Sequence, residues 1–151
     1  MRVIVTPDPF DANAELAAFA EARAGAGALA SFIGFCRAED GAVTQLDLQH
    51  YPGFTETEIA RLADAIRIRH AVDDLLVIHR VGAISPGQAI VLVAALSRHR
   101  TAAFAAVEEL MDYLKTDAPL WKRESGPSGA RWIEPTDLDR ERRAALTDEN
   151  K

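Results

Sequence analysis

Two apolar segments on either side of a short turn constrain the fold of this chain more than any other feature. The first, DLLVIHRVG, covers residues 74–82, and the second, AIVLVAALS, covers residues 89–97. The turn between them contains Ser85-Pro86-Gly87. Short runs that are rich in Val, Ile and Leu and end at turn residues are typical of strands. The two segments therefore predict a pair of strands joined by a turn.

Further strands are predicted earlier in the chain. Residues 2–6 form a short β-rich start, and residues 27–37, GALASFIGFCR, form an extended apolar stretch. Residues 44–51, TQLDLQHY, alternate leucines with polar residues, as a half-buried strand does. Asp40-Gly41 lies between these last two segments and predicts a hairpin turn there.

Three segments have the apolar spacing of amphipathic helices, at residues 11–24, 55–70 and 99–115. Thr55 and Glu58 have the spacing of a capping box at the start of the second helix. In the predicted order of elements, hairpins outnumber crossovers. This order favours an α+β domain with a mixed or largely antiparallel sheet.

Composition argues against several classes of function. The formal net charge of −6 argues against general nucleic-acid binding, which needs a basic surface. No apolar run approaches the ~20 residues that span a bilayer, and the chain does not start with a signal-peptide pattern. The single cysteine, Cys36, leaves no internal disulfide and no cysteine-based metal cluster. We therefore expect a cytoplasmic protein without a bound metal or cofactor, with one domain at residues 1–135 and a charged tail at residues 136–151.

Cationic side chains gather at two places in this acidic chain, and the first is the start of the third predicted helix. Arg98, His99 and Arg100 lie there, although the helix dipole disfavours cations at that end by roughly 0.3–1 kcal/mol each. Such an unfavourable arrangement points to an anion site, since the first N–H groups of a helix also attract an anion. The alternative is that these side chains point into solvent or pair with nearby acids.

The second cationic cluster is Lys115, Lys122 and Arg123, in the segment YLKTDAPLWKRE. Lys115 alone is explained by its place at the end of a helix, where the dipole favours a cation. Pro119 turns the chain back after the helix, and Trp121 can anchor the extended piece that follows. Such a turn can hold two lysines near one pocket, where a lysine acts as acid, base or nucleophile.

The first long apolar strand contains the only cysteine and ends at an arginine. By strand alternation, Arg37 shares a face with Phe35, whereas Cys36 points the other way. A lone cysteine in an apolar strand is more often a small buried hydrophobe than a nucleophile. His50 and His79 have no partner at metal-ligand spacing, so we expect core or hydrogen-bonded histidines.

Four segments, in this order, resemble the large, catalytic subunit of molybdopterin synthase: ASFIGFCR, LDLQHYPGFTE, VIHRVGAISPGQAIVLVAALSRHRTAAF and MDYLKTDAPLWKRE. The resemblance runs from about Val3 to Glu134 and implies an α/β-hammerhead-like fold with a small added subdomain. The enzyme resembled transfers sulfur to cyclic pyranopterin monophosphate (precursor Z) and forms the dithiolene of molybdopterin. Its sulfur comes from the C-terminal thiocarboxylate of a small ubiquitin-like carrier subunit, whose Gly-Gly tail enters a pocket of the large subunit. The assembly implied is a heterotetramer built on a homodimer of the large subunit.

The resemblance also implies roles for particular residues. The two lysines held to be catalytic fall on Lys115 and Lys122. The positions that line the pterin-phosphate site fall on Arg37, His99 and Arg100. At Phe35 the family often has lysine or another polar residue, and the position of Cys36 is not reliably cysteine. Substrate contacts are expected from Arg37, His99, Arg100, Arg123, Glu124, Phe35 and Cys36.

The spacing of the two clusters raises a geometric problem. On one unbroken helix, the fifteen residues from Arg100 to Lys115 span ~22 Å at ~1.5 Å each. A small pterin does not easily reach both ends. Either the helix is broken, or His99 and Arg100 of one subunit share a pocket with Lys115 and Lys122 of another. We predict the second arrangement, a composite site across a two-fold dimer.

Two alternatives remain open at the level of sequence. One is a different phosphate-ester or sulfur-transfer enzyme that uses Cys36 covalently. Activity that survives Lys115→Ala but not Cys36→Ser would favour it. The other is a non-catalytic module that binds a ubiquitin-like tail or a small anion, and carrier binding without turnover would identify that module.

Overall fold

The computed structural model describes residues 1–21 and 23–148, and its strands form two four-stranded sheets. The first sheet has the order β1 (Arg2–Thr6), β4 (Asp74–Arg80), β6 (Ala89–Ser97), β2 (Ala28–Phe35). The second has the order β5 (Gly82–Ile84), β3 (Gln45–His50), β7 (Leu120–Gly126), β8 (Gly129–Ile133). The helices are α1 (Ala12–Ala20), α2 (Phe54–Arg69), α3 (Arg100–Thr116) and α4 (Asp137–Asp148), with a short 3-10 turn η1 (Glu39–Gly41).

The predicted strand pair forms the centre of the first sheet. β4 and β6 pair antiparallel, with Asp74 opposite Leu96, and every residue of β4 is buried. β1 pairs with β4 in parallel, while all other described pairings are antiparallel. A strand that is covered on both faces needs no polar alternation, which explains its continuous apolar run. The α+β class with mixed and antiparallel sheets is confirmed.

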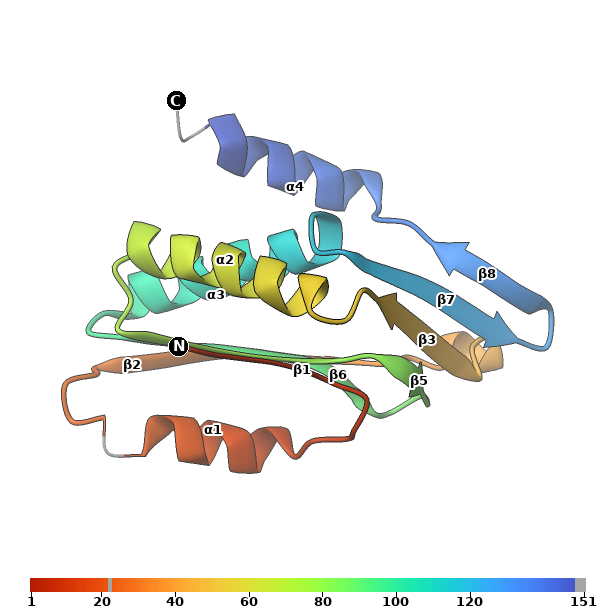
Figure 1. Ribbon diagram of the computed structural model, residues 1–151, viewed down its shortest axis with the longest axis horizontal. Helices are drawn as coiled ribbons and strands as arrows, with labels where there is room; N and C mark the ends of the chain where they lie inside the picture. The colour runs from red at the N-terminus through yellow and green to blue at the C-terminus, as the bar shows by residue number, and fades with distance from the viewer. Residues whose placement is uncertain (22, 149–151) are drawn as a thin grey trace.

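Helices cover both faces of the first sheet. Figure 1 shows α1 on one face, α2 and α3 on the other, and α4 outside α3. On the α2–α3 side the core includes Ile59, Ile66 and Leu110, and on the α1 side Phe19 packs against Ile78. This layering fixes α3 along the sheet, with its start and its end far apart.

The second sheet is the smaller part of the fold, and it overturns one prediction. Asp40-Gly41 was expected to join two paired strands, but β2 pairs with β6 and β3 pairs with β5 and β7. The chain therefore crosses from one sheet to the other at η1. Local turn chemistry predicts a change of direction there, but it does not determine which strands become partners.

Helix boundaries also differ from the predicted ones. The capping box predicted at Thr55 and Glu58 is wrong, because α2 begins one residue earlier, at Phe54. Gly53, with φ of 82°, precedes it and donates its N–H to the Glu56 carboxylate at 2.7 Å. Thr55 is fully buried and links two other segments.

The first helix is shorter than predicted. α1 is capped by the carboxylate of Asp11 and ends at Ala20, whereas the predicted helix continued to residue 24, past residue 22, which lies outside the described residues. The predicted tail at 136–151 is helical over its described part, since α4 reaches Asp148. None of the helices in the described chain is long and apolar enough to cross a membrane.

Candidate active site

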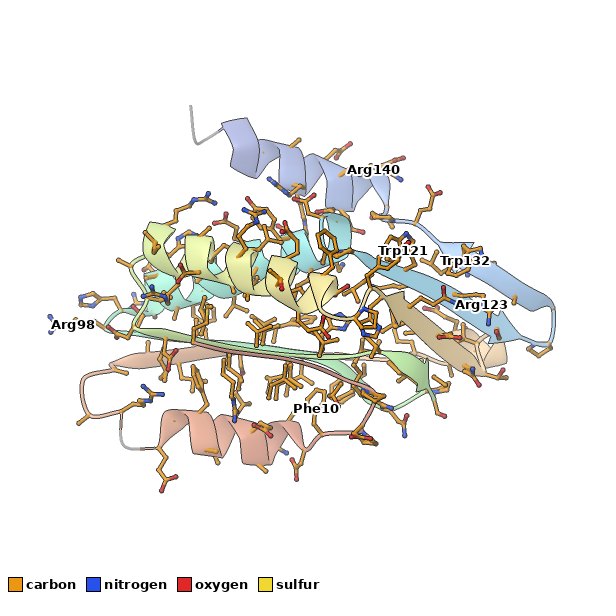
Figure 2. All side chains as sticks on the ribbon, viewed as in Figure 1. Phe10, Arg98, Trp121, Arg123, Trp132 and Arg140 are labelled. Carbon is orange, nitrogen blue, oxygen red and sulfur yellow. The ribbon has the colours of Figure 1, made fainter. Side chains whose placement is uncertain are left out.

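The third helix separates the candidate residues into two groups. α3 runs without a break from Arg100 to Thr116, so Arg100 and Lys115 lie at opposite ends of it. In Figure 2, Arg98 lies at one end of the molecule, and Trp121 and Arg123 lie toward the other. The predicted unbroken helix is confirmed, and the described chain does not bring the two groups together.

Lys115 lies in the last turn of α3, and Lys122 lies near it on β7. After Asp117 the chain turns at Pro119 and enters β7, as predicted from the proline. The turn is held by the Thr55 hydroxyl, which donates to the Pro119 carbonyl at 3.1 Å. The Lys115 ammonium is near enough for its charge to lower the pKa of Lys122.

Strand register places the side chains of β7 on two different faces. Leu48 of β3 lies opposite Lys122, and Leu46 lies opposite Glu124. Both leucines are buried in the small core between the sheets, so Lys122 and Glu124 point inward. Trp121 and Arg123 alternate with them and point outward. The predicted catalytic residue Lys122 and the predicted substrate contact Arg123 therefore lie on opposite faces of the second sheet.

Burial determines the protonation chemistry around Lys122. The pKa of Lys122 is lowered, first by desolvation and then by the positive charge of Lys115. His79 on β4 is buried, and desolvation lowers its pKa to about 4, with the charge of Lys122 adding to the effect. Its Nδ1 lies 2.8 Å from the Arg80 carbonyl, which accepts the hydrogen bond. The hydrogen-bonded core role predicted for His79 is confirmed.

The outward face of β7 carries an aromatic and charged surface. Trp121 meets Tyr51 edge to face, with ring centroids 5.2 Å apart. The Arg123 guanidinium lies 3.4 Å from the Asp47 carboxylate and 5.8 Å from the ring centroid of Trp132. Its Nε is buried and has no hydrogen-bond partner among the described atoms. On the inward face, Glu124 accepts a hydrogen bond from Arg131 at 3.1 Å.

The other group of candidates surrounds the start of α3. His99 is the residue before the helix and does not cap it with its side chain, and Arg98, His99 and Arg100 are all exposed. Arg37 does not belong to this group: β2 runs antiparallel to β6, with Ala28 opposite Ser97 and Phe35 opposite Ala89, so Arg37 lies beyond the other end of the first sheet. Its side chain is 81% exposed and pairs with the carboxylate of Glu39 at 2.6 Å. These cations are thus accessible to an anion.

Phe35 and Cys36 differ in exposure. β2 ends at Phe35, two residues before the predicted end, and its pairing register with β6 shifts between Gly34 and Phe35. Phe35 is exposed, whereas Cys36 is buried with Val43 and the inward leucines of β3. Desolvation and the charge of Glu124 raise the pKa of the Cys36 thiol. Such a thiol is a poor nucleophile, and a substrate contact by Cys36 stays a prediction.

Three residues near the lysines were missed by sequence reasoning. Asp139 of α4 lies 3.1 Å from the Lys115 ammonium, Asp47 pairs with Arg123, and Tyr51 packs on Trp121. The spacing Thr136-Asp-Leu-Asp139 is a capping pattern, and it was the available signal for the first of them. No local pattern marks the other two, since their partners are more than 60 residues away in sequence.

A cavity of about 410 Å³ lies between α2 and the layer of α3 and α4. Its arginines already have carboxylate partners: Arg61 with Glu58, Arg69 with Glu109 and Arg143 with Asp117. Neither lysine lines this cavity. Within the described residues, no group of three or more His, Cys, Asp or Glu side chains is placed to hold a metal ion.

Known proteins resemble this chain in sequence and in structure. Residues 5–117 match the family described as MoaE protein. The molybdopterin synthase catalytic subunit of Caulobacter vibrioides is 50% identical over 140 residues, which is 93% of each chain. The MoaE protein of Burkholderia ambifaria has a similar structure, with a TM-score of 0.80 and 41% identity over 100% of this chain and 99% of that one.

A more distant structure shares the fold alone. The complex of subunit 1 and 2 of molybdopterin-converting factor from Helicobacter pylori contains a chain with a TM-score of 0.72 and 22% identity. The match covers 89% of this chain and 90% of that chain. The family match and the 50% identity together show that the chain belongs to the MoaE protein family.

Proposed function

We propose that this chain is the catalytic subunit of a molybdopterin synthase. It transfers sulfur from the C-terminal thiocarboxylate of a small ubiquitin-like subunit to cyclic pyranopterin monophosphate, and the product carries the molybdopterin dithiolene. Family membership supports this reaction, because relatives of similar length are named as catalytic subunits of that enzyme. The cytoplasm remains the expected location, since a single cysteine that is buried fits a reducing compartment.

The observation that carries the proposal is the pair of lysines at the end of α3. A partly buried lysine with a lowered pKa gives up its proton more readily than an exposed one, which suits Lys122 to proton transfer. Lys115 is more exposed and supplies a positive charge beside it. As sulfur attacks, this charge stabilises the developing oxyanion, while Lys122 delivers a proton to the leaving group.

Arg37, beyond the end of β2, and the cations at the start of α3 are assigned to the substrate phosphate. The planar guanidinium groups of Arg37 and Arg100 make several hydrogen bonds to one phosphate, and the first N–H groups of α3 favour an anion. Because the single chain holds His99 and Arg100 apart from Arg37 and from the two lysines, the site combines two copies of the chain. Contacts from Phe35, Cys36, Arg123 and Glu124 belong to the same proposal.

The free edge of β2 supports this arrangement. β2 is the last strand of the first sheet, and three of its apolar side chains, Leu29, Phe32 and Phe35, are exposed. Antiparallel pairing of β2 with its copy, centred on Phe32, directs Arg37 of one copy toward Gly27 of the other. Gly27 lies against Arg98 of its own chain, since a Cβ at Gly27 would be 2.4 Å from the Arg98 carbonyl oxygen. This pairing therefore brings Arg37 of one copy toward the start of α3 of the other.

The outward face of β7 is assigned to the carrier. Tyr51, Phe54, Trp121 and Trp132 are all exposed, and aromatic side chains are enriched at protein interfaces. The tail of a carrier bound there has only to pass the edge of the second sheet to reach Lys122. No nucleic acid or membrane partner is proposed.

A single-turnover assay tests the proposed function. Purified protein is mixed with cyclic pyranopterin monophosphate and thiocarboxylated carrier, and molybdopterin is followed by fluorescence after oxidation. We expect Lys115→Ala and Lys122→Ala to slow product formation by about 100-fold or more, since each removes charge stabilisation or proton transfer. Arg61→Ala is the matched control, because it removes an exposed cation of α2 that pairs only with Glu58 in the described contacts.

The same assay separates the alternatives. Folded wild-type protein that binds the carrier and yields no product would support a non-catalytic binding module. Activity that is lost in Cys36→Ser and kept in both lysine variants would support an enzyme with a cysteine nucleophile. The burial of Cys36 and its raised pKa argue against that second outcome.

A further inference from the structure

A carboxylate of the C-terminal helix contacts one of the two lysines. Asp139 Oδ1 lies 3.1 Å from Lys115 Nζ, and the Asp139 side chain is only 13% exposed. The residue belongs to the range 136–151 that was expected to be a charged tail. Instead α4 packs against α3 and delivers this carboxylate to the end of that helix.

Asp139 is held in place by a reciprocal pair of hydrogen bonds. The Thr136 hydroxyl and the Thr136 N–H both donate to Asp139 Oδ2, at 2.7 and 3.0 Å. The Asp139 N–H in turn donates to the Thr136 hydroxyl at 3.2 Å. Asp139 Oδ2 therefore accepts the hydrogen bonds at the start of α4, and Asp139 Oδ1 pairs with Lys115. A carboxylate fixed in this way presents its second oxygen in one orientation.

The helix itself is fastened to α3 next to the lysine. Arg143 lies 2.6 Å from the Asp117 carboxylate, and its guanidinium stacks 3.9 Å from the ring centroid of Tyr113. Asp117 is the residue that follows the end of α3. These contacts fix the distance between α4 and the last turn of α3, where Lys115 lies.

We propose that Asp139 is a positioning residue of the catalytic site, which holds the Lys115 ammonium beside Lys122. This inference rests on the proposed function. It assigns a different role to each lysine. Lys115 is held in place and supplies a positive charge, and Lys122 transfers the proton to the leaving group. Asp139 acts through Lys115 and does not itself touch substrate.

Electrostatics at the site agree with this division. Two ammonium groups that lie close together repel each other, and a carboxylate beside one of them offsets the repulsion. Burial and Lys115 lower the pKa of Lys122, whereas the Asp139 and Glu124 carboxylates act in the opposite direction. The pKa of Asp139 is lowered to about 2, against the effect of desolvation, by hydrogen bonds from Thr136 and Lys115, so its charge persists at neutral pH. Two further titratable groups interact with the lysines: Asp112 on α3 with Lys115, and His79 on β4 with Lys122. Glu108 on α3 and Arg142 on α4 act on Asp112.

The composition of the chain allows a direct test. The sequence contains three lysines, Lys115, Lys122 and Lys151, so NMR of protein labelled at lysine Cε follows each one. In Asp139→Asn a negative charge is lost, which disfavours the protonated amines. We expect the Lys115 and Lys122 titrations to move to lower pH, while Lys151 does not change.

Kinetics of the same variant test the role in the reaction. We expect the single-turnover rate of Asp139→Asn to fall about tenfold, in line with a lost charged hydrogen bond, without a change in carrier affinity. The alkaline limb of the rate should move to lower pH together with the Lys122 titration, because Lys122 must be protonated to deliver its proton. Asp139→Glu keeps the carboxylate and the capping pattern, so it should recover most of the rate.

Thr136→Ala separates positioning from helix stability. It removes the hydroxyl that caps α4 but keeps the charge beside Lys115, so it should not move the lysine titrations. Unchanged titrations in Asp139→Asn, or equal shifts in Asp139→Asn and Thr136→Ala, would overturn the proposal. Shifted titrations with an unchanged rate would overturn it as well. Wild-type protein without turnover would instead refute the proposed function, while the titrations would still decide whether Asp139 holds Lys115.

Discussion

At the scale of the residue, burial determines which ionisable groups are available for chemistry. His79 illustrates this, since its ring is buried in the first sheet and its pKa is lowered to about 4. The lowered pKa means that protonation favours the unfolded chain. The contribution of His79 to stability is therefore complete above the unfolded pKa of 6.5 and is lost as pH falls toward 4.

This sign leads to a prediction about acid sensitivity. Between pH 7.5 and pH 5, His79 alone should reduce the free energy of unfolding by about 2 kcal/mol. His79→Gln cannot take up a proton, so it should lose that part of the pH dependence, whatever its stability at pH 7.5. Urea unfolding of both proteins at the two pH values measures the difference. Parallel pH dependence in the two proteins would contradict the assigned burial of a neutral His79.

Sequence patterns predicted the environment of a residue correctly only where neighbouring residues in the sequence determine that environment. Cys36 was expected to be buried because it lies in an apolar strand, and it is buried. The Thr55–Glu58 spacing matched a capping box, yet Gly53 starts the helix and Thr55 points into the core. A pattern match cannot tell a threonine that caps a helix from one that bonds to a turn 64 residues later.

At the scale of the element, one buried hydroxyl connects three segments around the lysines. Thr55, in the first turn of α2, accepts from the Tyr51 N–H at 3.0 Å and donates to the Pro119 carbonyl at 3.1 Å. It thereby ties the end of β3 to the turn between α3 and β7. The position of Lys122 depends on that turn.

Removal of this hydroxyl should be costly. Thr55→Val keeps the shape of the side chain but removes the partner of the Tyr51 N–H and of the Pro119 carbonyl, two partly buried hydrogen bonds, so we expect it to destabilise the fold by about 2 kcal/mol. Thr55→Ser keeps the hydroxyl and loses one methyl group, which should cost about 1 kcal/mol. Urea unfolding compares the two. A valine variant as stable as the wild type would show that these hydrogen bonds do not hold the turn.

The types of the elements were predictable, but their partners were not. Helical spacing gave α3 to within a residue at each end, and alternation gave the strand at residues 44–51. The pairing of β3 with β7 joins residues about 70 to 80 positions apart, such as Asp47 and Arg123. No local pattern encodes such a contact, so the division into two sheets could not be seen in advance.

At the scale of the whole molecule, the unbroken helix α3 determines how many copies of the chain a complete site needs. The helix places Arg100 and Lys115 at opposite ends of one chain, and the proposed reaction needs a phosphate site and two lysines around one substrate. A homodimer in which each site takes residues from both copies meets both requirements. The separation of Arg100 from Lys115 was predictable from the sequence, because it depends only on the length of the helix between them.

Mixing two inactive variants tests this account most directly. Arg100→Ala and Lys115→Ala are each expected to be nearly inactive in the single-turnover assay. Equal amounts are unfolded together, refolded and assayed, so that half of the dimers contain one copy of each. A composite site predicts that the mixture regains about a quarter of the wild-type activity, because each mixed dimer has one complete site. A mixture that forms mixed dimers, shown by mass spectrometry, and stays inactive would contradict the composite site.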